Sequence, residues 1–102
     1  MMPAQKFAPT RTIGVDVDGT LHTDGRLNRS VVAFCEKQKA AGFRIMLWSA
    51  RGKEHAQAAA DRLGVSHLFD DIVSKPGYVL DDPGWSWIKY TKVITTLAVD
   101  PE

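Results

Sequence analysis

The chain has 102 residues, the size of one domain, and its 13 Lys and Arg against 12 Asp and Glu leave a net charge of +1. This near balance gives no electrostatic footprint for nucleic acid. The single cysteine excludes an internal disulfide and indicates a reducing compartment, for which we expect the cytoplasm. Residues 1–10 contain two prolines and no long apolar run. We therefore expect a loose arm with neither a signal peptide nor a membrane span.

A strand predicted over about 12–17 ends in two carboxylates. By the two-residue period of a strand, Ile13, Val15 and Val17 share one face, and Asp16 and Asp18 share the other. Aspartate is depleted in strands and is costly to bury without a partner. Two aspartates on one face at a strand end therefore need a counter-charge, most simply a divalent cation.

The residues after this strand favour a sharp turn. Gly19 lets the chain turn, and Thr20 offers a hydroxyl beside the carboxylates. The alternative interpretation is a strand that runs into an Asp-Gly hairpin turn. Residues 22–26 (HTDGR) contain a second Asp-Gly pair and predict a small flap over the strand end. His22 and Arg26 could touch a ligand there, although solvated turn positions suit them better.

A helix is expected between residue 28 and Gly42. Asn28 or Ser30 can cap its beginning, and Gly42 is a good stop. Cys35, within this helix, fits a small apolar core position. The sequence says nothing about its reactivity, which depends on its surroundings.

A second strand and a second helix follow. The continuous apolar run 43–48 (FRIMLW) is typical of a strand in a sheet that is covered on both faces, and Ser49 stands at its carboxyl end. The alanine-rich stretch 53–63 predicts a helix closed by Gly64. This order of strand, helix, strand and helix implies parallel pairing with right-handed crossovers.

The last third of the chain is less regular. A short strand is possible near 71–73, and residues 78–80 (YVL) predict a third clear strand that runs into Asp81 and Asp82. The tail is ambiguous: residues 87–90 could form an edge strand, and 93–97 a strand or a short helix.

Polar side chains thus follow each predicted apolar strand. They are, in chain order, Asp16, Asp18 and Thr20, then Ser49, then Asp81 and Asp82, with Lys75 just before the last strand. Ligands of open parallel sheets bind outside the carboxyl ends of the strands. The sequence therefore predicts one crevice that gathers carboxylates, hydroxyls and an ammonium group.

This ordered set resembles the haloacid dehalogenase superfamily. Its four motifs match residues 16–20 (DVDGT), Ser49, Lys75 and the pair Asp81 and Asp82. The resemblance covers roughly residues 12–84, and the junction 48–51 (WSAR) looks like that of small capless members. It implies an α/β fold in which a three-layer Rossmann-like parallel sheet has helices on both faces. The whole chain, 1–102, would form one such domain, and no segment is long enough for a cap domain.

Chemistry and resemblance together suggest roles for the acidic residues. Asp16 can act as a nucleophile toward phosphorus. Asp18 can protonate the leaving oxygen and then activate water. This role needs a carboxyl that can hold a proton, which anionic neighbours of Asp18 would favour. Family members that dehalogenate lack a second aspartate in the first motif, so Asp18 implies a phosphatase. Mg²⁺ prefers oxygen ligands. We expect Asp16 and Asp81 to bind it with the backbone carbonyl of Asp18, the last by resemblance, while Asp82 orients its water.

A second group of residues would stabilise charge on the transferring phosphoryl group. It comprises Thr20, Ser49, Lys75 and the backbone N–H groups near Gly19 and Ala50, with Arg51 on the leaving group. Each has a simpler interpretation. Ser49 could cap the helix that starts near Lys53, Lys75 and Arg51 could be surface groups, and residues 81–84 form a good turn by themselves.

The expected function is Mg²⁺-dependent hydrolysis of phosphomonoesters through an aspartyl-phosphate. The alternatives are a binding or regulatory module that keeps the fold without meaningful turnover, and a phosphatase acting on nucleic-acid ends. Partners would be a phosphorylated small molecule or macromolecule, or a second copy of the chain. We expect Trp85, Trp87 and Tyr90 to pack beside the crevice, bordering the substrate entrance or a self-association surface.

Overall fold

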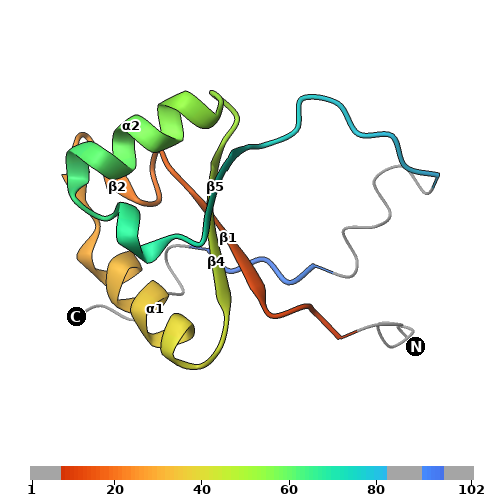
Figure 1. The fold of residues 1–102 in the computed structure, drawn as a ribbon, viewed down its shortest axis with the longest axis horizontal. Helices are drawn as coiled ribbons and strands as arrows, with labels where there is room; N and C mark the ends of the chain where they lie inside the picture. Colours follow the sequence, from red (N-terminus) through yellow and green to blue (C-terminus); the bar gives the residue numbers. More distant parts are fainter. Residues whose placement is uncertain (1–7, 83–90, 96–102) are drawn as a thin grey trace.

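The computed structural model describes residues 8–82 and 91–95 (Figure 1). The helices and strands lie in the first of these ranges. In order they are β1 (Thr12–Asp16), β2 (His22–Thr23), β3 (Arg26–Leu27), α1 (Arg29–Ala40), β4 (Arg44–Ser49), α2 (Lys53–Leu63), the 3₁₀ turn η1 (Ser66–Leu68) and β5 (Asp71–Ser74). The predicted α/β architecture is confirmed. No helix in the described ranges is long and apolar enough to cross a membrane.

The main sheet has the strand order β1-β4-β5, and both pairs are parallel. Asp16 lies opposite Trp48 at the end of β1, and Ser49 lies opposite Ser74 at the end of β4. The polar residues at the ends of β1 and β4 therefore lie at the same end of the sheet. Both crossovers step in the same direction across the sheet, so right-handed connections place α1 and α2 on the same face (Figure 1).

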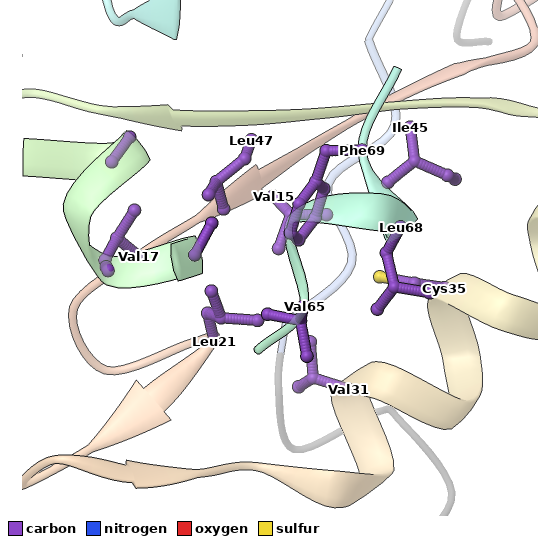
Figure 2. Packing of buried hydrophobic residues seen from close by; sticks show 13 residues of the cluster. Val15, Val17, Leu21, Val31, Cys35, Ile45, Leu47, Val65, Leu68 and Phe69 are labelled. Atoms are coloured by element: carbon purple, nitrogen blue, oxygen red, sulfur yellow. The ribbon is translucent and has the colours of Figure 1, made fainter. Parts of the chain in front are cut away.

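The core lies between this face and the two helices (Figure 2). Its buried members come from β1, α1, β4, α2, η1 and the loops beside them: Val15, Val17, Leu21, Val31, Cys35, Ile45, Leu47, Ala56, Ala59, Ala60, Val65, Leu68 and Phe69. Alternation along β4 turns Ile45 and Leu47 inward, whereas Met46 and Trp48 are half-buried on the opposite face. The described residues thus form two layers, and a helical layer on the second face stays a prediction.

Close packing on that second face explains one glycine. A Cβ atom at Gly14 would lie 3.0 Å from the Cε2 atom of Trp48, tighter than nearly all real Cβ contacts. Gly14 therefore lets the indole of Trp48 in β4 come close to the backbone of β1, two residues before Asp16.

The flap predicted over residues 22–26 is a two-stranded hairpin of β2 and β3. Asp24 and Gly25 turn it with φ values of 51° and 80°, the left-handed pair that suits a tight hairpin. Asn28 precedes α1 at the N-cap position but does not cap it with its side chain. Its Nδ2 instead donates to the carbonyl of Thr20 at 2.7 Å and to Thr23 Oγ1 at 3.1 Å, which fixes the hairpin against the start of the helix.

The prediction of a third strand at 78–80 is wrong. The third strand of the sheet is β5, close to the short strand considered near 71–73, and residues 78–80 form no strand. Tyr78 and Leu80 are 98% and 106% exposed. The physical reason is that β5 already occupies this edge of β4, with the Arg44 Nε to Asp71 Oδ2 ion pair at 2.8 Å joining the two strands.

Other predictions fall on the ends of the chain. Residues 93–95 form neither a strand nor a helix, and Val93 is 80% exposed. Of the arm predicted over residues 1–10, residues 8–10 form neither a helix nor a strand and are exposed. Residues 1–7 and the aromatic tail with Trp85, Trp87 and Tyr90 lie outside the described residues.

Candidate functional site

The first carboxylate of β1 meets a lysine. Lys75 Nζ lies 3.2 Å from Asp16 Oδ1, and the two side chains are 35% and 37% exposed. The backbone N–H of Lys75 donates to the carbonyl of Ser49 at 2.9 Å. The end of β4 therefore fixes the position of the Lys75 backbone. Its ammonium group also lies 5.5 Å from the centre of the Trp48 ring, within the range of a cation–π contact. Lys75 is thus placed beside Asp16, where a counter-charge is needed.

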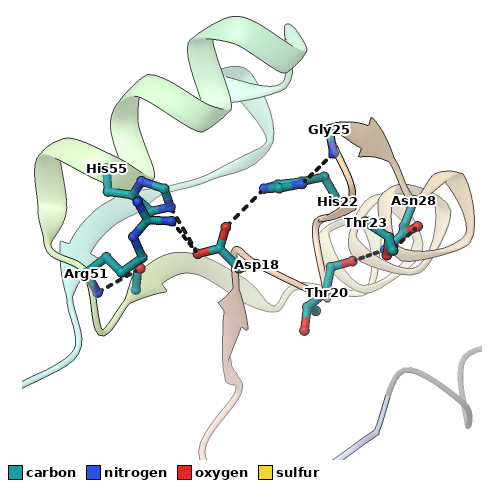
Figure 3. A network of polar contacts seen from close by, with 9 residues as sticks. Asp18, Thr20, His22, Thr23, Gly25, Asn28, Arg51 and His55 are labelled. Atoms are coloured by element: carbon teal, nitrogen blue, oxygen red, sulfur yellow. Dashed lines mark hydrogen bonds and ion pairs between the residues drawn. The ribbon is translucent and has the colours of Figure 1, made fainter.

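The second carboxylate lies just past β1 and has three basic neighbours (Figure 3). Asp18 Oδ2 is 3.0 Å from His55 Nε2 and 3.7 Å from Arg51 Nη1, while Asp18 Oδ1 is 3.3 Å from His22 Nε2. His22 comes from β2, Arg51 from the loop after β4, and His55 from the first turn of α2. Three segments therefore converge on one side chain.

The loop after β1 is shaped by its own backbone. Gly19, with φ of 81°, donates its N–H to the carbonyl of His22 at 2.9 Å, and Leu21 donates to the carbonyl of Val17 at 2.9 Å. Gly19 is suited to this left-handed φ because it has no Cβ. The turn brings the imidazole of His22 back over Asp18.

Hydrogen bonding fixes the tautomer of His22. The backbone N–H of Gly25 donates to His22 Nδ1 at 3.2 Å, so this ring nitrogen is an acceptor. In the neutral imidazole the other nitrogen then carries the proton. His22 therefore presents an Nε2–H group to Asp18.

The environment of Asp18 is basic, and the expectation of anionic neighbours is wrong for the described residues. Partial burial raises the pKa of the Asp18 carboxyl. The hydrogen bond from His55 and the charges of His55, Arg51 and His22 outweigh this effect, so the pKa of Asp18 lies below its ordinary value. The side chain is nevertheless 44% exposed and remains within reach of a ligand.

Ser49 is buried, with 2% of its surface exposed. Its Oγ accepts a hydrogen bond from the backbone N–H of Arg51 at 3.0 Å, and its carbonyl accepts from Gly52 at 3.1 Å. The hydroxyl thus stabilises the turn between β4 and α2. The simpler interpretation is a cap for the helix, but the hydroxyl binds a backbone N–H of the turn and none of α2. Ala50 and Arg51, the next two residues, are exposed. This turn delivers Arg51 and α2 to the strand end.

Thr20 lies on the hairpin side of the loop. Its carbonyl accepts from Asn28, and Figure 3 shows it near Asn28 and Thr23, across Asp18 from Arg51 and His55. Within the described residues its hydroxyl has no recorded hydrogen bond. Thr20 is therefore close to Asp18 in the sequence, but in the structure it lies beside Asn28 and Thr23.

The predicted acidic pair is not brought to the site. Asp81 and Asp82 are exposed and follow the stretch that forms no strand. In ranges 8–82 and 91–95, no group of three or more His, Cys, Asp or Glu side chains is arranged to hold a metal ion. The carboxylate of Asp16 faces Lys75, and that of Asp18 faces basic groups, so the donors as arranged here do not form a magnesium site.

One residue of this cluster was missed by sequence reasoning. His55 is 37 residues from Asp18 in the chain, and nothing in the first motif points to it. A signal did exist. The helix after a parallel strand starts at the carboxyl edge of the sheet, so a histidine in its first turn is close to whatever that edge binds.

No family model, curated protein or solved structure matched the chain.

Proposed function

We propose that this protein is a phosphomonoester hydrolase of the haloacid dehalogenase type, which works through an aspartyl-phosphate on Asp16. The observation that carries the proposal is the pair of carboxylates at the end of β1 with separate basic partners. Asp16 contacts Lys75 at 3.2 Å, and Asp18 contacts His55 at 3.0 Å. Both lie at the carboxyl edge of a parallel sheet, the usual place for a ligand.

Each carboxylate has a distinct part in the proposed reaction. Asp16 attacks phosphorus, a P–O bond to the carboxylate forms, and the bond to the leaving oxygen breaks. Asp18 gives a proton to that oxygen, then takes one from the water that hydrolyses the aspartyl-phosphate and releases Asp16. Lys75 neutralises charge on the phosphoryl oxygens, with the backbone N–H of Ala50 as a further donor, whereas the N–H of Gly19 already donates to the carbonyl of His22.

The basic neighbours of Asp18 favour its role as a base over its role as an acid. A lowered pKa keeps its carboxyl ionised, which suits the base that activates water better than the acid that protonates a leaving group. We therefore propose that esters with good leaving groups, such as aryl phosphates, are hydrolysed faster than alkyl phosphates.

The proposal includes Mg²⁺ and the complete layered fold of the family. Asp16, Asp81 and the carbonyl of Asp18 would hold the ion, with Asp82 orienting its water. Support for the ion comes from the oxygen-donor chemistry alone, because the described arrangement does not assemble these groups. When bound, Mg²⁺ would offset charge on the phosphate. A three-layer Rossmann-like domain without a cap belongs to the same proposal.

Replacing Asp16 tests the nucleophile. Asp16→Asn keeps the shape of the side chain and should lower turnover of an aryl phosphate about 10³-fold or more in the presence of Mg²⁺. Asp24→Asn is the control, because Asp24 turns the hairpin with a left-handed φ of 51° that asparagine also adopts. Acid quenching of wild type with ³²P-labelled substrate should leave label on the protein, and Asp16→Asn should leave none. Wild-type activity in Asp16→Asn would refute the assignment.

A catalytically silent binding module is the second candidate. The observation in its favour is that Asp16 and Asp18 already have basic partners and that Asp81 and Asp82 lie elsewhere. Purified wild-type protein decides between the two. Turnover of phosphate esters supports the hydrolase, while tight binding of phosphate esters without turnover supports the module.

A further inference from the structure

We infer that His55 is a positioning residue, which holds Oδ2 of Asp18 so that Oδ1 is the oxygen that exchanges protons with the leaving group and water. The inference rests on the proposed function, and it concerns a residue outside the four motifs. It follows from how the donors are distributed over the two carboxylate oxygens.

The two oxygens of Asp18 are unequally engaged. Oδ2 has the short contact to His55 Nε2 at 3.0 Å and the longer one to Arg51 at 3.7 Å. Among the residues that the structure describes, Oδ1 has one polar contact, to His22 Nε2 at 3.3 Å, which is longer than a good N–H···O bond. Because each carboxylate oxygen can accept about two hydrogen bonds, Oδ1 keeps capacity for a substrate atom or a water. The reacting oxygen is therefore the one that His55 does not hold.

His55 is well placed to act as a fixed point. It stands in the first turn of α2, and its side chain is 24% exposed. The next residue, Ala56, is completely buried in the core, and Ala59 and Ala60 secure the same helix face. A group on a packed helix holds a partner more firmly than a group on a loop. Arg51, by contrast, is in a loop and 67% exposed.

The loop that carries Asp18 does not need His55 for its shape. Backbone hydrogen bonds already close it, from Gly19 to His22 at 2.9 Å, from Leu21 to Val17 at 2.9 Å and from Asn28 to Leu21 at 2.9 Å. Removing the imidazole would therefore free the side-chain torsions of Asp18 and leave the loop in place. Because misplacing a reacting group by about 1 Å can cost roughly 100-fold in rate, the added mobility of the Asp18 side chain should lower turnover.

The test compares His55→Ala, His55→Gln and the control His67→Ala on an aryl phosphate. We expect His55→Ala to lower kcat by about 10- to 100-fold with KM within about twofold of wild type, because Asp18 acts in the transition state. His55→Gln places an amide N–H near the position of Nε2 and should restore part of kcat. His67 is an exposed residue of η1, so His67→Ala should match wild type. His22→Ala should have a smaller effect than His55→Ala.

A double variant shows whether His55 acts through Asp18. Asp18→Asn with His55→Ala should be no slower than Asp18→Asn alone, since the group being positioned is already gone. Fully additive losses, an unchanged kcat in His55→Ala, or a rise in KM alone would each overturn the inference. If far-UV circular dichroism shows that His55→Ala does not fold, His55→Gln replaces it. The inference is then decided by the kcat of His55→Gln and by comparing Asp18→Asn with and without His55→Gln. Absence of turnover in wild type would instead overturn the proposed function.

Discussion

Asp16 and Asp18 are separated by one residue, yet their ion-pair partners among the described residues differ. Asp16 contacts a lysine that follows β5, whereas Asp18 contacts groups from β2, α2 and the loop after β4. The end of β1 explains this difference, because Asp16 is the last residue of the strand and Asp18 already lies beyond it in the loop. Two side chains of the same type can therefore take different parts in one reaction.

Burial makes Cys35 inert in the folded protein. It is 1% exposed on the core side of α1, and burial, together with the charge of Glu36, raises the pKa of its thiol to about 11. The thiolate is the reactive form, so at pH 8 only about one molecule in 1,000 would be ready to react. We expect native protein at pH 8 to resist iodoacetamide and to be fully alkylated in urea. As the chain has a single cysteine, mass spectrometry reads the result directly. Rapid alkylation of native protein would contradict the packing of α1.

Sequence reasoning at the residue scale found the partners that share a motif and missed those that do not. Lys75 was expected near the carboxylates and lies 3.2 Å from Asp16. His55 was not expected, because a short polar contact across 37 residues leaves no trace in local spacing. The role of Ser49 in the turn was foreseen in outline, since a serine before a helix commonly binds backbone N–H groups.

At the scale of elements, β5 shows that a local sequence pattern does not determine which segment becomes the third strand of the sheet. Its ends are polar, and Ile72 and Val73 are its only apolar pair. Residues 78–80 have a stronger strand pattern but form no strand, because β5 already pairs with β4 along that side. The longer elements β4, α1 and α2 were predicted correctly, since their periodicity extends over enough residues to determine their type.

The side chain of Asp70 joins two elements, α1 and β4, and gives a pH-dependent prediction. Its Oδ2 accepts from the backbone N–H of Ile45 at 2.8 Å, and its Oδ1 lies 3.5 Å from Lys39 of α1. The hydrogen bond from Ile45 lowers the pKa of Asp70, partial burial opposes this, and Lys39 lowers it further. A carboxyl with a lowered folded-state pKa stabilises the fold above its unfolded pKa of about 3.9, and that stabilisation is lost as the pH falls through the folded-state value.

Urea unfolding at pH 6 and pH 2.5 measures this effect. Asp70→Asn should unfold at lower urea than wild type at pH 6, and the difference should shrink at pH 2.5, because protonation of Asp70 removes the charge that the asparagine variant lacks. Asp24→Asn, which alters a carboxylate at the hairpin tip, serves as the control and should show little difference at either pH. An Asp70→Asn deficit that is equal at both pH values would show that the ionised carboxylate contributes nothing.

For the whole molecule, Mg²⁺ offers a test that does not depend on turnover. If Asp16 and Asp81 bind the ion, mass action should stabilise the folded state by about 1.4 kcal/mol at ten times the dissociation constant. For a domain of this size that is a rise in Tm of several degrees. Asp81→Ala should remove the rise, and Asp24→Asn should keep it. A Tm indifferent to millimolar Mg²⁺, with activity that survives chelation, would rule out the ion.

In the described sheet, β4 is the strand with two partners, β1 on one side and β5 on the other. During synthesis β1 leaves the ribosome first, but it has no strand to pair with until Ser49 has followed. The aspartates of the first motif are therefore exposed on a nascent chain for the whole time that α1 and β4 are being made. Completion of β4 creates the first stable β-α-β unit, and the arrival of His55 and then Lys75 gives each aspartate its partner. The order of the strands thus fixes the order in which the site is assembled.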